Sequence, residues 1–321
     1  MATVTQELSR EQLAAWLLEG DPAIRWRVFR DLESAPAELV MTERYRVATD
    51  GWGARLLALQ GVDGRWAGGL YGPKWTSTHY TLLLLHWLGL PPGNEQALLG
   101  TRILWDAATR NAGGLTLSTG TPTPEVCITA MLVLLACSFG LEDDRIEESV
   151  EWLLRNQLAD GGWNCRSIRD GSTHGSFHSS ISTLDALRAY VAAGRVIDVG
   201  PAMRTGEEFF LAHRLYRSHL TGEVANPAFT RFPFPPQWHF DVLRGLEHFR
   251  AVNSPRDPRL ADAVEVVRDA RMNDGRWRGH RRYSGREWFT LEPAGPSRWS
   301  TVRARAVLAW PQADPSVTPS T

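Results

Sequence analysis

The chain has 321 residues, is 43% hydrophobic, and carries 35 basic against 36 acidic residues, a formal net charge of -1. This balance leaves no excess of basic side chains, so neither nucleic acid nor an anionic membrane is expected as the main partner. The longest apolar runs, residues 81–85 and 128–137, are shorter than the roughly 20 residues that a membrane-spanning helix needs.

The amino terminus and the cysteines give information on the cellular compartment of the protein. Residues 1–7 lack the basic start and the following apolar stretch of a signal peptide. The three cysteines are an odd number without a disulfide-rich pattern. These features predict a protein of the reducing cytoplasm.

The chain repeats one local pattern, in which a Gly- or Pro-rich turn precedes an extended segment and a strongly apolar helix. The predicted apolar helices are 80–88, 128–139, 179–193, 240–249 and 301–310. The residues that open them, His79, Cys127, His178, His239 and Ser300, lie about 50–60 residues apart, a spacing typical of helix-hairpin repeats. One more unit projects back to Asp21 and Pro22, since Asp followed by Pro is a common helix opening.

Amphipathic helices are predicted between the apolar ones, for example at 145–157 and 260–268. Helices that are apolar nearly all round belong inside a fold, and helices with one apolar face belong outside it. The sequence therefore predicts a single all-α domain over residues 1–310, with an inner ring of helices wrapped by an outer ring around a central cavity. Residues 311–321 are predicted to be a disordered tail.

Three turns carry a resemblance to a known superfamily. Gln157-x-x-Asp-Gly-Gly-Trp163, Gln60-x-x-Asp-Gly-Arg-Trp66 and Asn273-Asp-Gly-Arg-Trp277 resemble the Gln-Trp repeats of squalene-hopene cyclases and protein prenyltransferase β-subunits. The resemblance extends roughly from Asp21 to Trp310 and implies an (α/α)6 toroid. It also implies an enzyme acting on a hydrophobic small molecule of the isoprenoid class in the central cavity.

The chain departs from both branches of that superfamily. It has no Asp-x-Asp-Asp acid motif and about half the length of a two-barrel cyclase, so a standard acid-initiated polyene cyclisation is not expected. In prenyltransferase β-subunits, an Asp-x-Cys pair and a His at inner-helix openings hold zinc. His178 and His239 occupy analogous openings, whereas Ser176-Phe177-His178 stands where Asp-x-Cys would, and Glu125-x-Cys127 imitates that spacing one repeat earlier.

Polar groups recur at the openings of the inner helices, which should meet at one mouth of the ring. Three imidazole or thiolate ligands with one open position define a catalytic zinc site. The predicted zinc ligands are Cys165, His178 and His239, with Cys127 as the replacement for Cys165. Asp241 is predicted as a fourth ligand or as an acceptor that orients an imidazole. A metal-free acid–base site built from His178, His239 and Asp241 remains an alternative.

Aromatic and basic residues are expected to hold the substrate near this mouth. The predicted substrate-binding residues are Trp75, His79, Tyr80, Phe177, Trp238, Arg298 and Trp299. Aromatic faces stabilise cations, although packing between repeats explains the same residues. The arginine-rich segment 276–298 is either a salt-bridged loop or a basic lid for a diphosphate or carboxylate.

Three function classes remain open from the sequence. The first is the enzyme described above, and the second is a non-catalytic toroid that binds a hydrophobic ligand or serves as a scaffold. The third, a carbohydrate-processing toroid, needs two carboxylates at the mouth, for which Glu125 and Asp241 are the candidates. The oligomeric state is not predicted.

Overall fold

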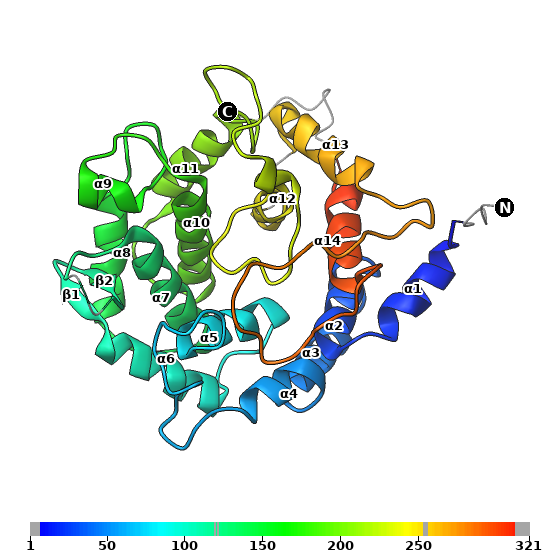
Figure 1. The fold of residues 1–321 in the computed structure, drawn as a ribbon, viewed down its shortest axis with the longest axis horizontal. Coiled ribbons are helices and arrows are strands. Elements are labelled where there is room, and N and C mark those ends of the chain that lie inside the picture. Colours follow the sequence, from blue (N-terminus) through cyan, green and yellow to red (C-terminus); the bar gives the residue numbers. More distant parts are fainter. Residues whose placement is uncertain (1–6, 119, 121, 253–255, 312–321) are drawn as a thin grey trace.

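The computed structural model describes residues 7–118, 120, 122–252 and 256–311. Within these residues the regular structure is helical, apart from the antiparallel pair β1 (Thr109–Asn111) and β2 (Gly114–Thr116). Figure 1 shows the helices arranged as a ring viewed down its axis. The all-α prediction is confirmed. Except for Pro311, the predicted tail 311–321 lies outside the described residues.

The inner ring contains the five predicted apolar helices and the helix projected at Asp21. Its members are α2 (Pro22–Asp31), α5 (Thr78–Leu88), α7 (Val126–Phe139), α10 (Phe177–Ala192), α12 (Val242–Ala251) and α14 (Arg298–Ala309). In α7 nearly every side chain is buried, as an inner position requires. Asp21 caps α2, since its Oδ1 accepts a hydrogen bond from Ala23 N at 2.9 Å.

The outer helices complete the repeats and close the ring. They are α1 (Arg10–Leu18), α3 (Ala37–Tyr45), α4 (Gly51–Leu57), α6 (Glu95–Ala107), α8 (Arg145–Arg155), α11 (Gly200–Ala212) and α13 (Ala261–Asp269), with the short α9 (Cys165–Asp170) and the 3-10 turns η1 (Arg46–Ala48), η2 (Pro227–Thr230) and η3 (Pro258–Leu260) between elements. In α8, Ile146, Val150 and Leu153 form the buried face. The last inner helix, α14, packs against the first, α2. The predicted toroid is confirmed.

Three tryptophan turns join the outer and inner rings in the same way. The indole N–H of Trp66, Trp163 and Trp277 donates to a carbonyl ten residues earlier, at Leu56, Leu153 and Val267 respectively. The backbone N–H of each tryptophan donates to a hydroxyl in the first turn or two of the next inner helix, on Thr78, Ser180 and Thr301 respectively. Each turn thereby fixes where an inner helix begins.

The outer helices make room for two of these indole rings. Gly100 in α6 and Gly206 in α11 lie against Trp66 and Trp163, where a Cβ atom would come within 2.7 Å of the ring in both cases. A fourth repeat keeps the backbone bond without the indole, because Leu115 N donates to Thr129 Oγ1 at 2.8 Å. The bond from the backbone to a helix hydroxyl therefore occurs in more repeats than the indole bond does.

Two segments cross the mouth of the ring. Residues 231–241 precede α12 and residues 278–297 precede α14, and Figure 1 shows both passing over the centre. The ends of the second segment are tied together by a bond from Gly279 N to Gly295 O at 2.9 Å. We refer to residues 279–297 as the lid. None of the helices in the described ranges is long and apolar enough to cross a membrane.

We expect Trp163→Phe to lower the free energy of unfolding by roughly 1–3 kcal/mol, because it leaves the buried Leu153 carbonyl without its donor. Chemical denaturation measures the change. Trp299→Phe is the matched control, since Trp299 is 1% exposed and its indole nitrogen has no hydrogen-bond partner. Equal losses in the two variants would show that ring volume, and not the indole bond, stabilises the turn.

Candidate active site at the mouth of the ring

The inner helices begin at a common rim, as predicted. Cys165 Sγ, beside the start of α10, lies 3.0 Å from Cys127 Sγ at the start of α7. The start of α10 meets the segment before α12, because Phe240 N donates to His178 Nδ1 at 2.9 Å. Contacts at the remaining openings complete the rim: Trp75 lies 6.1 Å from His239, Phe234 stacks on Trp299 at 3.8 Å, and Arg298 bonds Trp16 O ahead of α2.

A stack of three rings occupies one side of the mouth. His239 lies between Trp238, with ring centroids 3.7 Å apart, and Tyr283 of the lid, 3.4 Å away and nearly parallel at 8°. His178 meets His239 edge-on at 5.7 Å. The predicted residues Trp238, His178 and His239 are thus brought together, and Tyr283 joins them from a distant part of the chain.

The aromatic wall continues along the rim to α5. Trp75 packs edge-on against Tyr80 at 4.7 Å, and Tyr71 lies 5.2 Å from Tyr80 and 5.3 Å from His79. His79 is fully buried, and neither of its ring nitrogens has a hydrogen-bond partner. The predicted residues Trp75, His79 and Tyr80 therefore belong to one continuous surface of rings.

The three predicted histidines of the rim are neutral at physiological pH. Burial lowers the pKa of His79 to about 3 and that of His178 to about 4. Burial, with a smaller contribution from His178, lowers the pKa of His239 to about 3. A neutral imidazole can accept a proton but has none in excess to give. The proton donor of an acid–base site must be another group.

Asp241 has the properties of that donor. It is 1% exposed at the N-terminus of α12, and burial raises its pKa from 3.8 to about 6 against the opposing effect of Arg303. Its Oδ1 accepts from Arg244 N at 2.9 Å, whereas its Oδ2 has no hydrogen-bond partner. Its charge also raises the pKa of Tyr283, so the two groups are electrostatic neighbours.

The residues present do not fit the predicted zinc ion. In the described part of the chain, no three His, Cys, Asp or Glu side chains gather closely enough to hold a metal. A histidine that binds zinc through Nε2 carries its hydrogen on Nδ1. His178 Nδ1 instead accepts a hydrogen bond from Phe240 N, which places the hydrogen of the neutral ring on Nε2. No step of the chemistry is routed through zinc.

Three other predicted residues occupy different surroundings. Phe177 packs among Phe209, Phe229 and Phe240 behind the rim, which joins neighbouring repeats. Arg298 donates to Trp16 O at 2.7 Å and to Glu19 at 3.1 Å, and it does not line the pocket between the lid and the start of α14 that is described next. Trp299 is 1% exposed beneath Phe234. Their expected substrate contacts remain predictions.

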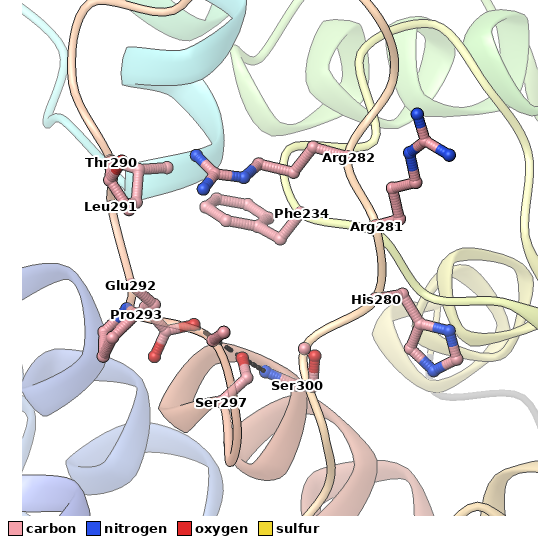
Figure 2. Close-up of a pocket in the computed structure, with 12 residues that line it drawn as sticks. Phe234, His280, Arg281, Arg282, Thr290, Leu291, Glu292, Pro293, Ser297 and Ser300 are labelled. Carbon is pink, nitrogen blue, oxygen red and sulfur yellow. Dashed lines mark hydrogen bonds between the residues drawn. The ribbon is translucent and has the colours of Figure 1, made fainter.

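A pocket of about 330 Å³ lies between the lid and the start of α14. Figure 2 shows Phe234 and Arg282 along one side of it, with Ser297 and Ser300 opposite. The side chains of His280 and Arg281 point away from the opening. Arg282 pairs with Glu287 at 2.6 Å and Arg276 with Asp274 at 2.8 Å. The arginine-rich segment 276–298 therefore includes salt-bridged residues, as one sequence interpretation expected.

Contacts from the rim hold the lid in place. Trp75 Nε1 donates to Ser284 O at 3.0 Å, and Arg286 N donates to Lys74 O at 2.7 Å. Gly285 permits this approach, because a Cβ atom there would lie 2.3 Å from the Trp75 ring. Trp288 Nε1 donates to Thr81 Oγ1 at 3.0 Å. The lid is thus attached to α5 and to the segment that precedes it.

Ion pairs fill the interior of the ring beneath the mouth. Arg244 of α12 pairs with Asp185 of α10 at 2.8 Å, and both side chains are 3% exposed. Arg244 also lies 5.0 Å from the ring of Trp87 on α5, on the opposite side of the ring from α12. Glu247 of α12 pairs with Arg303 of α14 and lies 3.5 Å from Arg27 of α2. Polar groups therefore occupy space that the sequence assigned to a central cavity.

Sequence reasoning missed these charges and also Tyr71 and Tyr283. The sequence did contain a signal for the buried charges, because Asp185, Arg244 and Arg303 each lie within an apolar helix that was predicted to be inside. A charged residue there needs a partner from a neighbouring helix. No local pattern marked Tyr283, because its partner His239 is distant in sequence.

In comparisons with known proteins, this chain is similar to solved structures only in its fold. No protein-family model matches the chain, and no curated protein matches its sequence. A crystal structure of a protein from Actinoplanes is 18% identical, with 91% of this chain and 89% of that chain covered and a TM-score of 0.48. The type II terpene cyclase MstE from Scytonema is 14% identical, with 90% and 88% covered and a TM-score of 0.45. A variant of that cyclase in complex with its substrate geranylgeranyl dihydroxybenzoate is 14% identical, with 90% and 86% covered and a TM-score of 0.46.

We expect Asp185→Ala to lower the free energy of unfolding by roughly 3–5 kcal/mol, because it leaves the buried Arg244 guanidinium without its carboxylate. Glu151→Ala, which breaks the exposed pair with Arg155, should change it by at most about 0.5 kcal/mol. Urea unfolding of the two variants beside the wild type makes the comparison. A loss for Asp185→Ala as small as for Glu151→Ala would mean that water reaches the interior.

The raised pKa of Asp241 predicts a pH-dependent stability. A carboxyl group that holds its proton more tightly when folded stabilises the fold below its unfolded pKa of 3.8, and this stability is lost as pH rises through about 6. Between about pH 3 and pH 7, wild type should lose roughly 3 kcal/mol relative to Asp241→Asn. Denaturant unfolding across this range measures the difference.

Asp257→Asn is a control for which stability is expected to change with pH in the opposite direction. Arg259 lowers the pKa of Asp257, so its stabilising effect is lost as pH falls through that lowered pKa. Wild type should therefore lose stability relative to Asp257→Asn on acidification. A difference between wild type and Asp241→Asn that does not vary with pH would contradict the assignment of a raised pKa.

Proposed function

We propose that the protein is an enzyme that uses Asp241 as an acid–base catalyst on a hydrophobic small molecule of the isoprenoid class, bound at the mouth of the ring. The observation that carries the proposal is the Asp241 carboxyl, which is 1% exposed, has a pKa raised to about 6 and has an Oδ2 without a hydrogen-bond partner. Such a group can hold a proton near neutral pH and give it to a bound molecule.

The surroundings support chemistry on an apolar ligand. Trp75, Trp238 and Tyr283 present rings around His239, and aromatic faces stabilise a developing positive charge. Protonation of a carbon–carbon double bond creates such a charge. Loss of a proton elsewhere returns the molecule to neutrality, so the net reaction class is an isomerisation or a cyclisation.

The lid controls access in this proposal. Because Asp241 is 1% exposed, a ligand can reach it only after residues 279–297 shift. The lid is held by hydrogen bonds of Trp75, Arg286 and Trp288 and by the stacking of Tyr283 on His239, contacts that can break and re-form without unfolding the ring. The pocket of about 330 Å³ beneath the lid is where the ligand would first enter.

A second candidate function is non-catalytic binding of a hydrophobic ligand. The buried pairs of Arg244 with Asp185 and of Arg303 with Glu247 favour it, because they occupy interior space that a long chain molecule would need. This candidate shares the mouth pocket with the enzyme and differs in the absence of proton transfer. An isotope experiment separates the two.

Purified protein is incubated in heavy water with farnesol, geranylgeraniol or geranylgeranyl dihydroxybenzoate, and products are analysed by mass spectrometry. Because a carboxyl proton exchanges with solvent, the enzyme should place deuterium on a carbon of its product. Asp241→Asn should reduce this incorporation by about 10²–10⁴-fold, the usual contribution of a general acid–base group.

Asp21→Asn is the matched control. Asp21 also caps an inner helix and has a pKa raised by burial to about 6, but its Oδ2 accepts from Trp52 N at 2.6 Å. This variant should retain the deuterium incorporation of the wild type. Ligand binding, seen as quenching of tryptophan fluorescence, without any deuterated product would instead establish the binding function.

A further inference from the structure

Two of the three cysteines lie in contact, although they are 38 residues apart in sequence. Cys127 is in the first turn of α7, and Cys165 is the first residue of α9. Their sulfur atoms are 3.0 Å apart, and both residues are half-buried. The proposed acid–base chemistry uses neither thiol.

The two thiols are not equivalent. Cys165 Sγ is in hydrogen-bond contact with Cys127 Sγ, accepts a hydrogen bond from Cys127 N at 3.3 Å, and lies 3.6 Å from Ser179 Oγ. These contacts, led by the Cys127 thiol, lower the pKa of Cys165 to about 7. The same contact raises the pKa of Cys127. Cys165 is therefore the thiolate and nucleophile of the pair.

Charged and titratable groups around the pair also affect the pKa of the two thiols. Glu125, at the start of α7, raises the pKa of both thiols, and Tyr71 ahead of α5 is coupled electrostatically to them. Arg169 of α9 interacts electrostatically with Cys165, although Asp170 has the larger effect on the pKa of Arg169. The contact with Cys127 outweighs the opposing effects of burial and of Glu125, because the net shift of the Cys165 pKa is downward.

We propose that Cys127 and Cys165 are a redox-active dithiol, oxidised reversibly to an intramolecular disulfide by small disulfides of the glutathione type. The proposal goes beyond the acid–base function and does not depend on it. A disulfide needs its sulfurs about 2.05 Å apart, so the thiols must approach by roughly 1 Å from their present contact. The bond would attach α9 to α7 beside the mouth.

The reaction consists of two exchanges. The Cys165 thiolate attacks one sulfur of the small disulfide, breaks its S–S bond and releases one small thiolate. Cys127 then gives up its proton, attacks Cys165 Sγ and expels the second small thiolate. Two electrons pass from the cysteines to the small disulfide. One released thiolate takes up the proton of Cys127, and the other takes up from solvent the proton that Cys165 lost on ionisation.

The full-length protein is equilibrated with mixtures of reduced and oxidised glutathione, alkylated, and digested without reduction for mass spectrometry. We expect two of the three thiols to disappear together, with a cross-linked peptide pair containing Cys127 and Cys165. Excess reduced glutathione should restore both thiols. The oxidised protein should melt at a higher temperature than the reduced one, because the new bond restricts the unfolded chain.

Three variants assign the roles. Cys137→Ser is the matched control, because Cys137 lies on the same helix, is also half-buried and has a pKa raised by burial to about 12. This variant should behave as the wild type. Cys127→Ser should stop at a glutathione adduct on Cys165, and Cys165→Ser should not react.

Measurements on the wild type alone keep the proposal open to refutation if a variant fails to fold. The rate of Cys165 alkylation by iodoacetamide should rise with pH and reach half its maximum near pH 7. Three free thiols at every glutathione ratio, or a glutathione adduct that persists on wild-type Cys165 without cross-linking, would overturn the proposal.

Discussion

The arrangement of this protein depends on one repeated interaction, the hydrogen-bonded turn that precedes the inner helices α5, α7, α10 and α14. In the tryptophan turns, the indole bonds the outer helix while the backbone bonds a hydroxyl at the start of the inner helix. Trp163, for example, links Leu153 O to Ser180 Oγ through a single residue. Because the same geometry recurs at Trp66 and Trp277, those inner helices begin at one height. The common rim follows from this constraint.

The rim and the interior have different chemistry for a physical reason. Loops enter at the rim and bring aromatic side chains from distant repeats together, as with Tyr283 and His239. Deeper in the ring only helix side chains are present, and charged ones there must find partners in other helices. Asp185 and Arg244 meet in this way, as do Glu247 and Arg303. These pairs occupy interior space beneath the mouth.

Burial determines which groups at the mouth can act. It lowers the pKa of the imidazoles of His178 and His239, and it raises that of the Asp241 carboxyl. Desolvation disfavours the charged form of every group, so it lowers the pKa of the histidines and raises that of the carboxyl. The cysteine pair differs, because contacts with Cys127 lower the pKa of Cys165 although burial opposes them. The mouth therefore contains a buried carboxyl with a raised pKa and, beside α9, a thiol with a lowered pKa.

The helices were predictable from the sequence because their determinants are local. Apolar residues at 128–139 predicted α7, and Asp21 before Pro22 predicted the opening of α2. The spacing of these openings predicted the ring, because a helix that is apolar on every side must lie inside. His178, His239 and Asp241 could be named as candidates from their places at these openings.

Only the tertiary structure determined the surroundings of the candidates. The orientation of His178, which accepts the Phe240 N–H, depends on a neighbouring repeat and leaves no fit for zinc. The contact of Cys127 with Cys165 and the burial of Asp241 likewise depend on how distant segments pack. Proton affinity and ligand geometry depend on distances of a few ångströms between residues from different repeats. A one-dimensional pattern specifies the helices but does not contain those distances.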